Sequence, residues 1–264
     1  MTESAFRPDS AKDRVVLVTG GGTGIGHDIA RCFGEHGAKL AICSRKRDVI
    51  DGTTQELIAE GHDCLGLTCD VRDPIQVEAV MEAVVERYGR LDVVVNNAAG
   101  NFPAPMTSIS PKGFKTVVDI DLLGTYNVSK AAYDAWFGEH GGAIVNISAP
   151  FERMGAAFQA HVAAAKMGVD SLTRSCAIEW GPKGIRVNGV APGPIEGTEG
   201  MSRFAELMSG DEKAPTPLGR MGTKRDIANA VLFLCSDAAS FITGQVFAVC
   251  GGTSVDALKM DLPS

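Results

Sequence analysis

The stretch Arg14-Val15-Val16-Leu17-Val18 has the composition of a buried strand, and it runs directly into Thr19-Gly20-Gly21-Gly22-Thr23-Gly24-Ile25-Gly26, where a helical pattern begins. Glycine allows a tight turn and a close approach of another group to the backbone. A pyrophosphate can therefore rest on the exposed amides at the positive end of the helix. This placement predicts a dinucleotide site formed by Gly20, Gly22, Thr23, Gly24, Ile25 and Gly26, and a tight turn without a ligand is the alternative.

The rest of the chain alternates between short β-branched runs and helical patterns. Strand-like runs lie at residues 39–43, 64–70, 93–96, 142–147, 185–190 and 245–249. Helical patterns occupy residues 24–36, 47–60, 74–88, 111–137, 162–180 and 224–234. This alternation indicates right-handed βαβ crossovers and a mostly parallel sheet that is buried on both faces. We therefore expect an α/β fold, a single doubly wound Rossmann-type domain over residues 1–264, with its ligands at the carboxyl ends of the strands.

The composition narrows the classes of partner. The 264 residues carry a formal net charge of −7 at pH 7, and an acidic surface repels phosphate backbones and anionic headgroups. We expect neither a nucleic-acid partner nor a membrane partner. The seven cysteines are scattered without a CxxC pair, which indicates reduced thiols and no metal site. The first 14 residues are polar, no apolar run approaches a membrane span, and the last residues differ from a peroxisomal Ser-Lys-Leu address, so we expect a cytoplasmic protein.

The end of the second predicted strand indicates which nicotinamide cofactor is preferred. A site for NAD usually has an acidic residue here, which accepts hydrogen bonds from the adenosine ribose. This chain has Cys43-Ser44-Arg45-Lys46-Arg47 instead. Three cations and a hydroxyl suit a 2′-phosphate, because guanidinium groups bind phosphate with two parallel hydrogen bonds. We therefore expect NADP(H), bound by Ser44, Arg45 and Lys46, with a solvated run of surface charge as the alternative.

Motifs spread over nearly the whole chain resemble, in order, those of the short-chain dehydrogenase/reductase family. They are the glycine segment, Asp70-Val71, Asn96-Asn97-Ala98-Ala99-Gly100, Asn146-Ile147-Ser148, Lys166 and Pro192-Gly193-Pro194-Ile195. The resemblance implies that Asp70 and Val71 contact the adenine and that Lys166 holds the nicotinamide ribose. It also implies that Asn97, Ala98, Ala99 and Gly100 line the cofactor cleft, and that Pro192, Gly193, Ile195 and Thr198 embrace the carboxamide.

The position four residues before Lys166 departs from the family pattern. Ordinary members have a catalytic Tyr there, whose phenol exchanges a proton with an alcohol or carbonyl while the Lys lowers its pKa. This chain has Val162, in the run His161-Val162-Ala163-Ala164-Ala165-Lys166, so simple carbonyl reduction loses its proton donor. The missing Tyr, together with Ala98-Ala99-Gly100-Asn101-Phe102, resembles the peroxisomal-type 2,4-dienoyl-CoA reductases and their bacterial relatives.

That branch reduces a conjugated thioester, which explains why a phenol is dispensable. The resemblance implies that hydride from NADPH reaches Cδ, that charge moves onto the thioester oxygen, and that protonation at Cα gives a 3-enoyl-CoA in unsaturated fatty acid β-oxidation. Hydrogen-bond donors stabilise such a dienolate. The resemblance also implies that Asp121 delivers the proton, directly or through water, that Lys166 orients the cofactor and that Ser148 orients the substrate. The alternatives are a carboxylate that pairs within its helix and a hydroxyl bonded to the backbone.

Two further residues bear on the donor to the thioester oxygen. The mitochondrial type has a Tyr farther upstream of the Lys, and this chain has Phe151 at the matching position. His161 is a candidate replacement, although a single histidine beside an alanine run is more often structural.

An acyl-CoA substrate requires local cations in spite of the acidic total charge. The resemblance implies that the protein is a homotetramer and that the acyl-CoA is bound by Arg45, Arg72, Phe102, Ser110, Lys112 and Arg203. Taken singly, each of these side chains is equally consistent with a solvated surface residue. Two other functions stay open: another short-chain reductase of a keto or enoyl thioester, and a catalytically silent NADP(H)-binding regulator.

Overall fold

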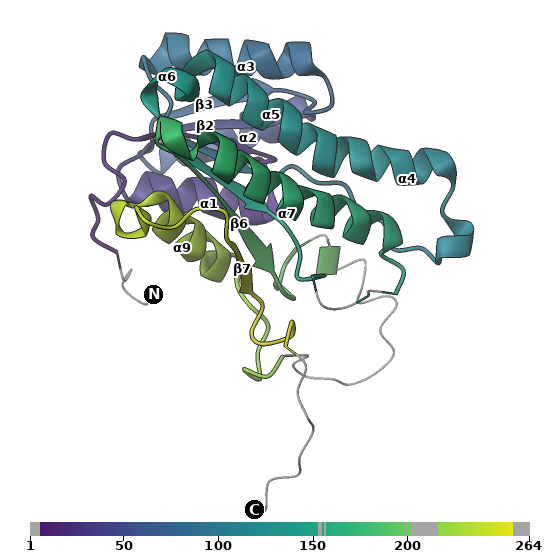
Figure 1. Cartoon of the computed structure of the whole chain (residues 1–264). Helices are drawn as coiled ribbons and strands as arrows, with labels where there is room; N and C mark the ends of the chain where they lie inside the picture. The colour runs from purple at the N-terminus through teal and green to yellow at the C-terminus, as the bar shows by residue number, and fades with distance from the viewer. Residues whose placement is uncertain (1–5, 153–154, 156, 199, 202–215, 256–264) are drawn as a thin grey trace, which may run out of the picture.

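The computed structural model contains one seven-stranded sheet in which every neighbouring pair of strands is parallel (Figure 1). The structure describes residues 6–152, 155, 157–198, 200–201 and 216–255. The strand order is β3-β2-β1-β4-β5-β6-β7. Their bounds are β1 (Val15–Thr19), β2 (Lys39–Ser44), β3 (Cys64–Thr68), β4 (Val93–Asn96), β5 (Gly142–Ile147), β6 (Ile185–Pro192) and β7 (Val246–Val249). The predicted α/β Rossmann-type fold is confirmed, and the sheet is wholly parallel.

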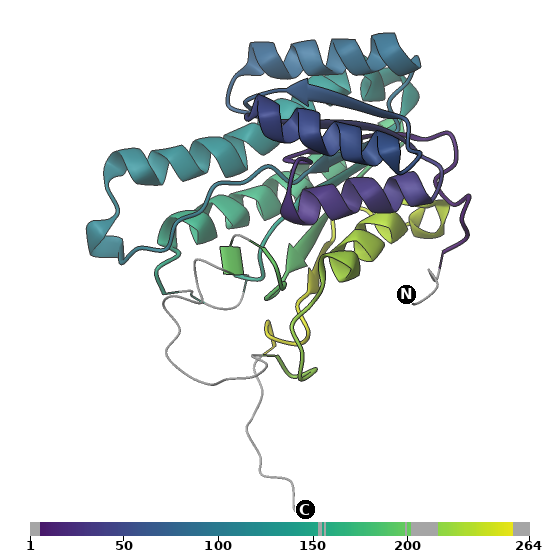
Figure 2. The ribbon, with the colours of Figure 1, turned by 180° about the vertical axis from the view of Figure 1, so that it is seen from behind.

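Helices cover both faces of this sheet (Figures 1 and 2). Those on one face are α1 (Gly24–Glu35), α2 (Arg47–Ala59) and α9 (Lys224–Cys235). The other face carries α3 (Pro74–Tyr88), α5 (Gly124–Ala132) and α7 (Ala160–Trp180), and α4 (Pro111–Val118) extends beyond it. Shorter helical segments are α6 (Gly138–His140), η1 (Met106–Ser108), η4 (Gly181–Lys183) and η5 (Asp237–Ala239).

The apolar core lies in two layers, one on each side of the sheet. Val18 of β1 belongs to the same buried cluster as Ile29 of α1 and Ile227 of α9, whereas Leu17, its neighbour in the strand, belongs to the cluster on the opposite side with Val128 of α5. Successive side chains of a strand point to opposite faces. All five residues of β1 are therefore buried, which explains why its sequence is a continuous apolar run.

The predicted helix 111–137 is one continuous helical stretch that changes its winding twice. Two π-helical segments, η2 (Asp119–Leu123) and η3 (Tyr133–Phe137), interrupt it. Single π-helical turns are rare and occur frequently at functional sites. The first of them contains Asp121, the residue predicted to deliver a proton.

The sheet reverses its winding between β1 and β4, so the connections leave these two strands toward opposite faces. In a doubly wound sheet the crevice outside the carboxyl ends of the strands at this reversal is where ligands bind. Three of the predicted cofactor segments follow the ends of β1, β2 and β4. The carboxyl ends of β1 and β2 lie one residue beyond prediction, and two strand ends differ by two residues, because β3 stops at Thr68 before Asp70 and β6 continues to Pro192.

Candidate active site

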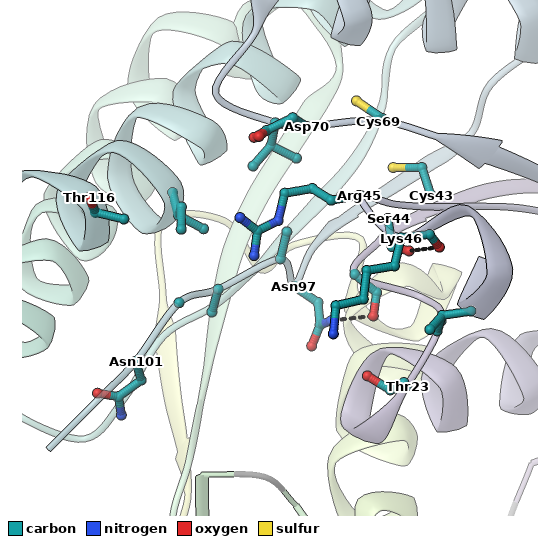
Figure 3. A pocket seen from close by; sticks show the side chains of 18 residues that line it. Thr23, Cys43, Ser44, Arg45, Lys46, Cys69, Asp70, Asn97, Asn101 and Thr116 are labelled. Carbon is teal, nitrogen blue, oxygen red and sulfur yellow. Dashed lines mark hydrogen bonds between the residues drawn. The ribbon is translucent and has the colours of Figure 1, made fainter. Parts of the chain in front are cut away.

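A cavity of about 580 Å³ lies at the carboxyl ends of β1 to β4 (Figure 3). Twelve of the residues predicted to bind the cofactor line it: Gly20, Gly22, Thr23, Ser44, Arg45, Lys46, Asp70, Val71, Asn97, Ala98, Ala99 and Gly100. Sequence reasoning missed six others: Cys43, Val49, Cys69, Asn101, Thr116 and Ile120. Cys43, Cys69 and Asn101 each adjoin a predicted residue in the chain, so extending each motif by one position would have found them.

The glycine loop is shaped for close backbone approach. Gly20 has φ +64°, and a Cβ at Gly26 would lie 2.4 Å from both Gly20 O and Asn97 Nδ2. The side chain of Thr19 fixes the loop after β4, because its Oγ1 accepts hydrogen bonds from Asn97 N at 3.0 Å and Ala98 N at 3.1 Å. Bare backbone therefore faces this part of the cavity, as the phosphates of a dinucleotide require.

Positive charge gathers at the far end of the cavity. Arg45 and Lys46 extend over it from the end of β2 (Figure 3). Arg72 pairs with Asp70, and its guanidinium holds the pKa of that carboxyl below its usual range, with the Arg45 charge acting in the same direction. Asp70 is thus kept ionised as an acceptor while Arg45 and Lys46 stay available to an anion.

Asp121 and Lys166 form a buried ion pair beside the cavity. Asp121 is 1% exposed and Lys166 is 6% exposed. Lys166 Nζ lies 3.3 Å from Asp121 Oδ2 and donates a 2.8 Å hydrogen bond to Ile147 O. Asp121 Oδ1 accepts a 2.7 Å hydrogen bond from Gly100 N. Because Gly100 and Ile120 line the cavity, this pair adjoins it through a single backbone hydrogen bond.

The Ser148 hydroxyl has a hydrogen-bond partner within the protein. Its hydroxyl donates a 2.5 Å hydrogen bond to Asp170 Oδ1 and lies 3.5 Å from Lys166 O, and all of these groups are buried. Burial raises the pKa of Asp170, and the hydrogen bond from Ser148 acts against that rise. Ser148 does not line the cavity. The hydroxyl is thus held by a buried carboxylate in this structure, and the substrate-orienting role of Ser148 stays a prediction.

An apolar cluster with one imidazole adjoins the ion pair. Val117, Val162 and Ala165 form its core, with Phe102 and Phe151 packed against them. His161, in the first turn of α7, meets the Phe102 ring edge-on with the ring centroids 4.4 Å apart. Burial lowers the pKa of His161, while the Phe102 backbone and the Asp121 charge act in the opposite direction.

The other residues predicted for acyl-CoA are partly engaged in structure. Ser110 caps α4, since its hydroxyl accepts a 3.0 Å hydrogen bond from Gly113 N, and Lys112 is exposed. A Cβ at Gly113 would lie 3.0 Å from Phe102 Cζ and 3.3 Å from Ser110 Oγ, so Phe102 and Ser110 meet at this glycine. Arg203 lies outside the described residues.

Some predicted cofactor residues lie away from the cavity lining. They are Gly24, Ile25, Gly26, Lys166, Pro192, Gly193, Ile195 and Thr198. Gly193 packs on the backbone of Cys250, and the buried Ile195 bridges to Gly222. Within the described ranges, no three His, Cys, Asp or Glu side chains are arranged to hold a metal, and no helix is long and apolar enough to cross a bilayer.

A family model described as "Enoyl-(Acyl carrier protein) reductase" matches residues 20–254. The chain belongs to the short-chain dehydrogenase/reductase family. A structure of actinorhodin polyketide ketoreductase with NADPH shares this fold at a TM-score of 0.87 and 34% identity, with 91% of this chain and 97% of that chain covered. The family and this NADPH-bound neighbour support a nicotinamide cofactor for the short-chain dehydrogenase/reductase described here.

Two sequence relatives carry a more specific name. A Danio rerio protein named peroxisomal 2,4-dienoyl-CoA reductase [(3E)-enoyl-CoA-producing] is 46% identical, over 94% of this chain and 83% of that protein. A Bacillus subtilis protein named probable 2,4-dienoyl-CoA reductase [(2E)-enoyl-CoA-producing] is 39% identical, over 90% of this chain and 96% of that protein. The predicted resemblance to this branch is thereby confirmed.

The three tyrosines of this short-chain dehydrogenase/reductase all lie away from the cavity lining. Tyr88 is hydrogen-bonded to Leu40 O, Tyr126 is 49% exposed, and Tyr133 stacks on Trp180. None of the three lines the cavity or hydrogen-bonds to the Asp121 and Lys166 pair. The catalytic tyrosine of ordinary family members is therefore absent at Val162, and no tyrosine from another part of the chain takes its place.

Proposed function

We propose that the chain is an NADPH-dependent 2,4-dienoyl-CoA reductase that acts in the degradation of unsaturated fatty acids. The observation that carries this proposal is Val162 in place of the phenol, beside a buried Asp121 and Lys166 pair. A ketone needs a proton on its own oxygen, whereas a dienolate needs hydrogen bonds at oxygen and a proton at carbon. The two dienoyl-CoA reductase relatives support the same reaction.

The residues beside the cavity divide the chemistry between them. NADPH, when bound, supplies the hydride that reaches Cδ of the dienoyl group. Lys166 orients the nicotinamide ribose, and its charge stabilises Asp121. Asp121 Oδ2 has no hydrogen bond among the described residues besides its ion pair with Lys166, so this oxygen can take a proton from solvent water and pass it toward Cα, which returns Asp121 to the carboxylate. Protonation at Cα restores the thioester carbonyl and leaves a 3-enoyl-CoA.

The preference for NADP(H) rests on the cavity end formed by Ser44, Arg45 and Lys46. All three line the cavity where an acidic residue would otherwise accept the ribose hydroxyls. A 2′-phosphate adds two negative charges at this position, and a guanidinium binds it with two parallel hydrogen bonds. The Asp70 carboxyl is already paired with Arg72, which leaves the Arg45 charge for the phosphate.

We propose that an acyl-CoA lies between the cationic side chains of Arg45 and Arg72 and the apolar cluster at Val162. Arg45 and Arg72 would bind the phosphates of CoA, while Phe102, Ser110 and Lys112 border the thioester. Phe102 supports this arrangement because it links the cavity-lining loop after β4 to the apolar cluster at Val162. Arg203 is proposed for the same role on the resemblance alone.

Assembly and compartment are also proposals. A homotetramer is supported by apolar side chains that are exposed on the single chain, namely Leu123, Tyr126, Ile178 and Phe247. A cytoplasmic location is supported by seven cysteines that are all free thiols. Several relatives are named peroxisomal, so a fluorescent fusion in the source cell decides the compartment, and light scattering decides the number of subunits.

The activity is tested by offering the purified protein NADPH together with a 2,4-dienoyl-CoA or, in parallel, with a 3-ketoacyl-CoA or a 2-enoyl-CoA. We expect NADPH absorbance to fall with the dienoyl thioester only. Oxidation with the 3-ketoacyl-CoA or the 2-enoyl-CoA alone would establish the second candidate, another short-chain reductase, which the description of the matching family model favours. NADPH binding without any turnover would establish the silent regulator.

A further inference from the structure

One buried histidine has no well-formed hydrogen bond among the described residues, although the Phe102 backbone is near enough to act on its ring. His161 is fully buried at 0% exposure, and within the described part of the chain neither ring nitrogen has a hydrogen bond of normal geometry. Leaving a buried polar group unsatisfied costs about 1–3 kcal/mol. His36, which is 2% exposed, shows the ordinary solution, because its Nδ1 lies 2.6 Å from Cys32 O. The unsatisfied state of His161 therefore calls for a functional explanation.

The surroundings of His161 place it beside the reacting groups. Asp121 is close enough for its charge to favour the protonated imidazole, and Val162 is the next residue on α7. The Phe102 ring covers the imidazole edge-on. Phe102 is half-buried on the irregular loop after β4, so a change of its rotamer would uncover the imidazole without unfolding any helix or strand.

The His161 imidazole is suited to donate a hydrogen bond without giving up its proton. Burial is the largest influence on the imidazole and lowers the pKa of His161, so the ring is neutral at neutral pH. A neutral imidazole has one N–H donor and one acceptor nitrogen. Two of the three N–H donors of Lys166 are engaged by Ile147 O and Asp121, and the third is assigned to the nicotinamide ribose, so none is left for the thioester oxygen.

We propose that the N–H of His161 donates a hydrogen bond to the thioester oxygen of the substrate and so replaces the phenol that is missing at Val162. This inference rests on the proposed dienoyl-CoA reduction. When hydride adds to Cδ, the electron pair of the diene moves onto the thioester oxygen, and His161 stabilises that charge while its N–H bond stays intact. The proton that reaches Cα comes from the Asp121 side, and the carbonyl then re-forms.

Two variants of His161 separate a donor from a packing residue. His161→Phe keeps a ring against Phe102 and removes the hydrogen bond, whereas His161→Gln keeps an N–H donor and loses the ring. Loss of one oxyanion donor typically lowers kcat by about 10²- to 10³-fold. We expect that loss in His161→Phe with unchanged NADPH affinity, and partial recovery of kcat in His161→Gln. A packing role predicts the reverse order, with His161→Phe the better enzyme.

His140→Phe is the matched control, because His140 also stacks on an aromatic ring, Trp136 at 3.9 Å, but lies next to β5 at the opposite end of the sheet. We expect it to keep wild-type kcat. Equal kcat in wild type and His161→Phe would overturn the proposal, whereas a wild type that fails to turn over any dienoyl-CoA would overturn the proposed function instead.

A spectroscopic measurement tests the hydrogen bond without turnover. A 2,4-dienoyl-CoA bound to the complex with NADP⁺ receives no hydride, and a hydrogen bond to its carbonyl shifts the dienoyl absorption to longer wavelength. We expect this shift in wild type and in His140→Phe, and a smaller shift in both His161 variants that tracks their kcat. An identical shift in wild type and His161→Phe, or no shift in wild type, would contradict the role of His161.

Discussion

The two halves of the crevice are built in different ways. The cofactor half, at the ends of β1, β2 and β3, is an open cavity lined by backbone of the glycine loop and by side chains that follow each strand directly. The half that we propose for catalysis, called the catalytic half below, lies beside β4 and β5 and holds Asp121, Lys166 and His161 at 6% exposure or less. The cofactor half is open to a ligand. The catalytic half is joined to the cavity lining by the hydrogen bond from Gly100 N to Asp121 Oδ1.

This difference shows that binding and chemistry depend on different interactions. A dinucleotide is held by amides and surface cations, which tolerate water. Proton transfer and charge stabilisation depend on groups whose electrostatic effect grows when water is excluded. The comparison therefore predicts that substitutions in the two halves change different quantities, NADPH affinity in one and kcat in the other.

The largest expected effect is in the catalytic half. Asp121→Asn keeps the shape of the side chain and its acceptor for Gly100 N, but it cannot pass a proton. We expect kcat with a dienoyl-CoA to fall by about 10²- to 10⁴-fold, the usual contribution of a general acid or base, while NADPH affinity is nearly unchanged. Steady-state kinetics and calorimetry measure the two quantities.

The control for Asp121→Asn is Asp119→Asn in the same π-helical turn. Asp119 forms a 2.6 Å pair with the exposed Lys115 and should be dispensable for kcat. Thermal melts accompany both variants, because removing one partner of a buried ion pair can cost about 3–5 kcal/mol. Wild-type kcat in a folded Asp121→Asn, with chemistry rate-limiting, would show that the carboxylate is structural.

Lys166→Ala should lower kcat and also raise the NADPH concentration that gives half the maximal rate, because it disturbs cofactor placement.

A smaller effect is expected in the cofactor half. Arg45→Asp replaces the cation proposed to bind the 2′-phosphate with an anion, and a hydrogen bond to a charged group contributes about 1.5–3 kcal/mol, or roughly 10- to 100-fold in affinity. We expect NADPH affinity to fall by that factor while NADH affinity changes little. The difference should shrink at high salt, where the charges are screened.

Arg47→Asp serves as the matched substitution for Arg45→Asp. Arg47 is 80% exposed in its side chain, does not line the cavity and pairs only with Asp51 among the described residues. Calorimetry on both variants, with NADPH and with NADH, separates a specific phosphate contact from a general change of surface charge. Equal affinity of the wild type for NADPH and NADH would remove the preference altogether.

The smallest expected effect on the reaction is at Ser148. Because its hydroxyl bonds Asp170, Ser148→Ala should lower stability by about 1–3 kcal/mol and leave kcat within a few-fold of wild type. A loss of kcat on the order of 10²-fold would instead restore the substrate-orienting role. Asp170→Asn is the companion variant, since it keeps an acceptor for Ser148 without the buried charge.

The stability that Ser148→Ala loses should depend on pH in a direction that the pKa of Asp170 determines. Burial raises the pKa of Asp170 in the folded protein above its ordinary 3.8. The folded state therefore binds the carboxyl proton more tightly than the unfolded state, and the protein loses stability as the pH rises from 3.8 through the raised pKa. Removing Ser148 takes away a hydrogen bond that lowers the pKa. Ser148→Ala should therefore lower the free energy of unfolding more at neutral pH than at a pH below 3.8, the ordinary pKa of Asp170. Chemical unfolding at the two pH values measures the difference.

The sequence predicted the cofactor half well because its signals are local. A buried apolar strand, a glycine turn and a helix follow one another in residues 14–36, and each constrains the next. The run Ser44-Arg45-Lys46 follows β2 directly, so its place at the cavity depends only on where that strand ends. Most of the lining was found in this way.

The contacts within the catalytic half were not predicted, because they join segments that are far apart in the chain. The ion pair of Asp121 with Lys166 joins η2 to α7, and the bond of Ser148 to Asp170 joins β5 to α7. No local pattern signals that a serine will bond to an acid on another element. The π-helical turn at Asp119–Leu123 also has no period that distinguishes it from the α-helix around it.

The most direct test of the account follows two labels into the product of one 2,4-dienoyl-CoA. Hydride is labelled with deuterium on NADPH in ordinary water, and in a second reaction unlabelled NADPH is used in heavy water, with the product analysed by NMR. The account predicts a 3-enoyl-CoA with the cofactor deuterium at Cδ and the solvent deuterium at Cα. A cofactor deuterium at Cβ, or a solvent deuterium at Cγ in a 2-enoyl-CoA, would contradict it.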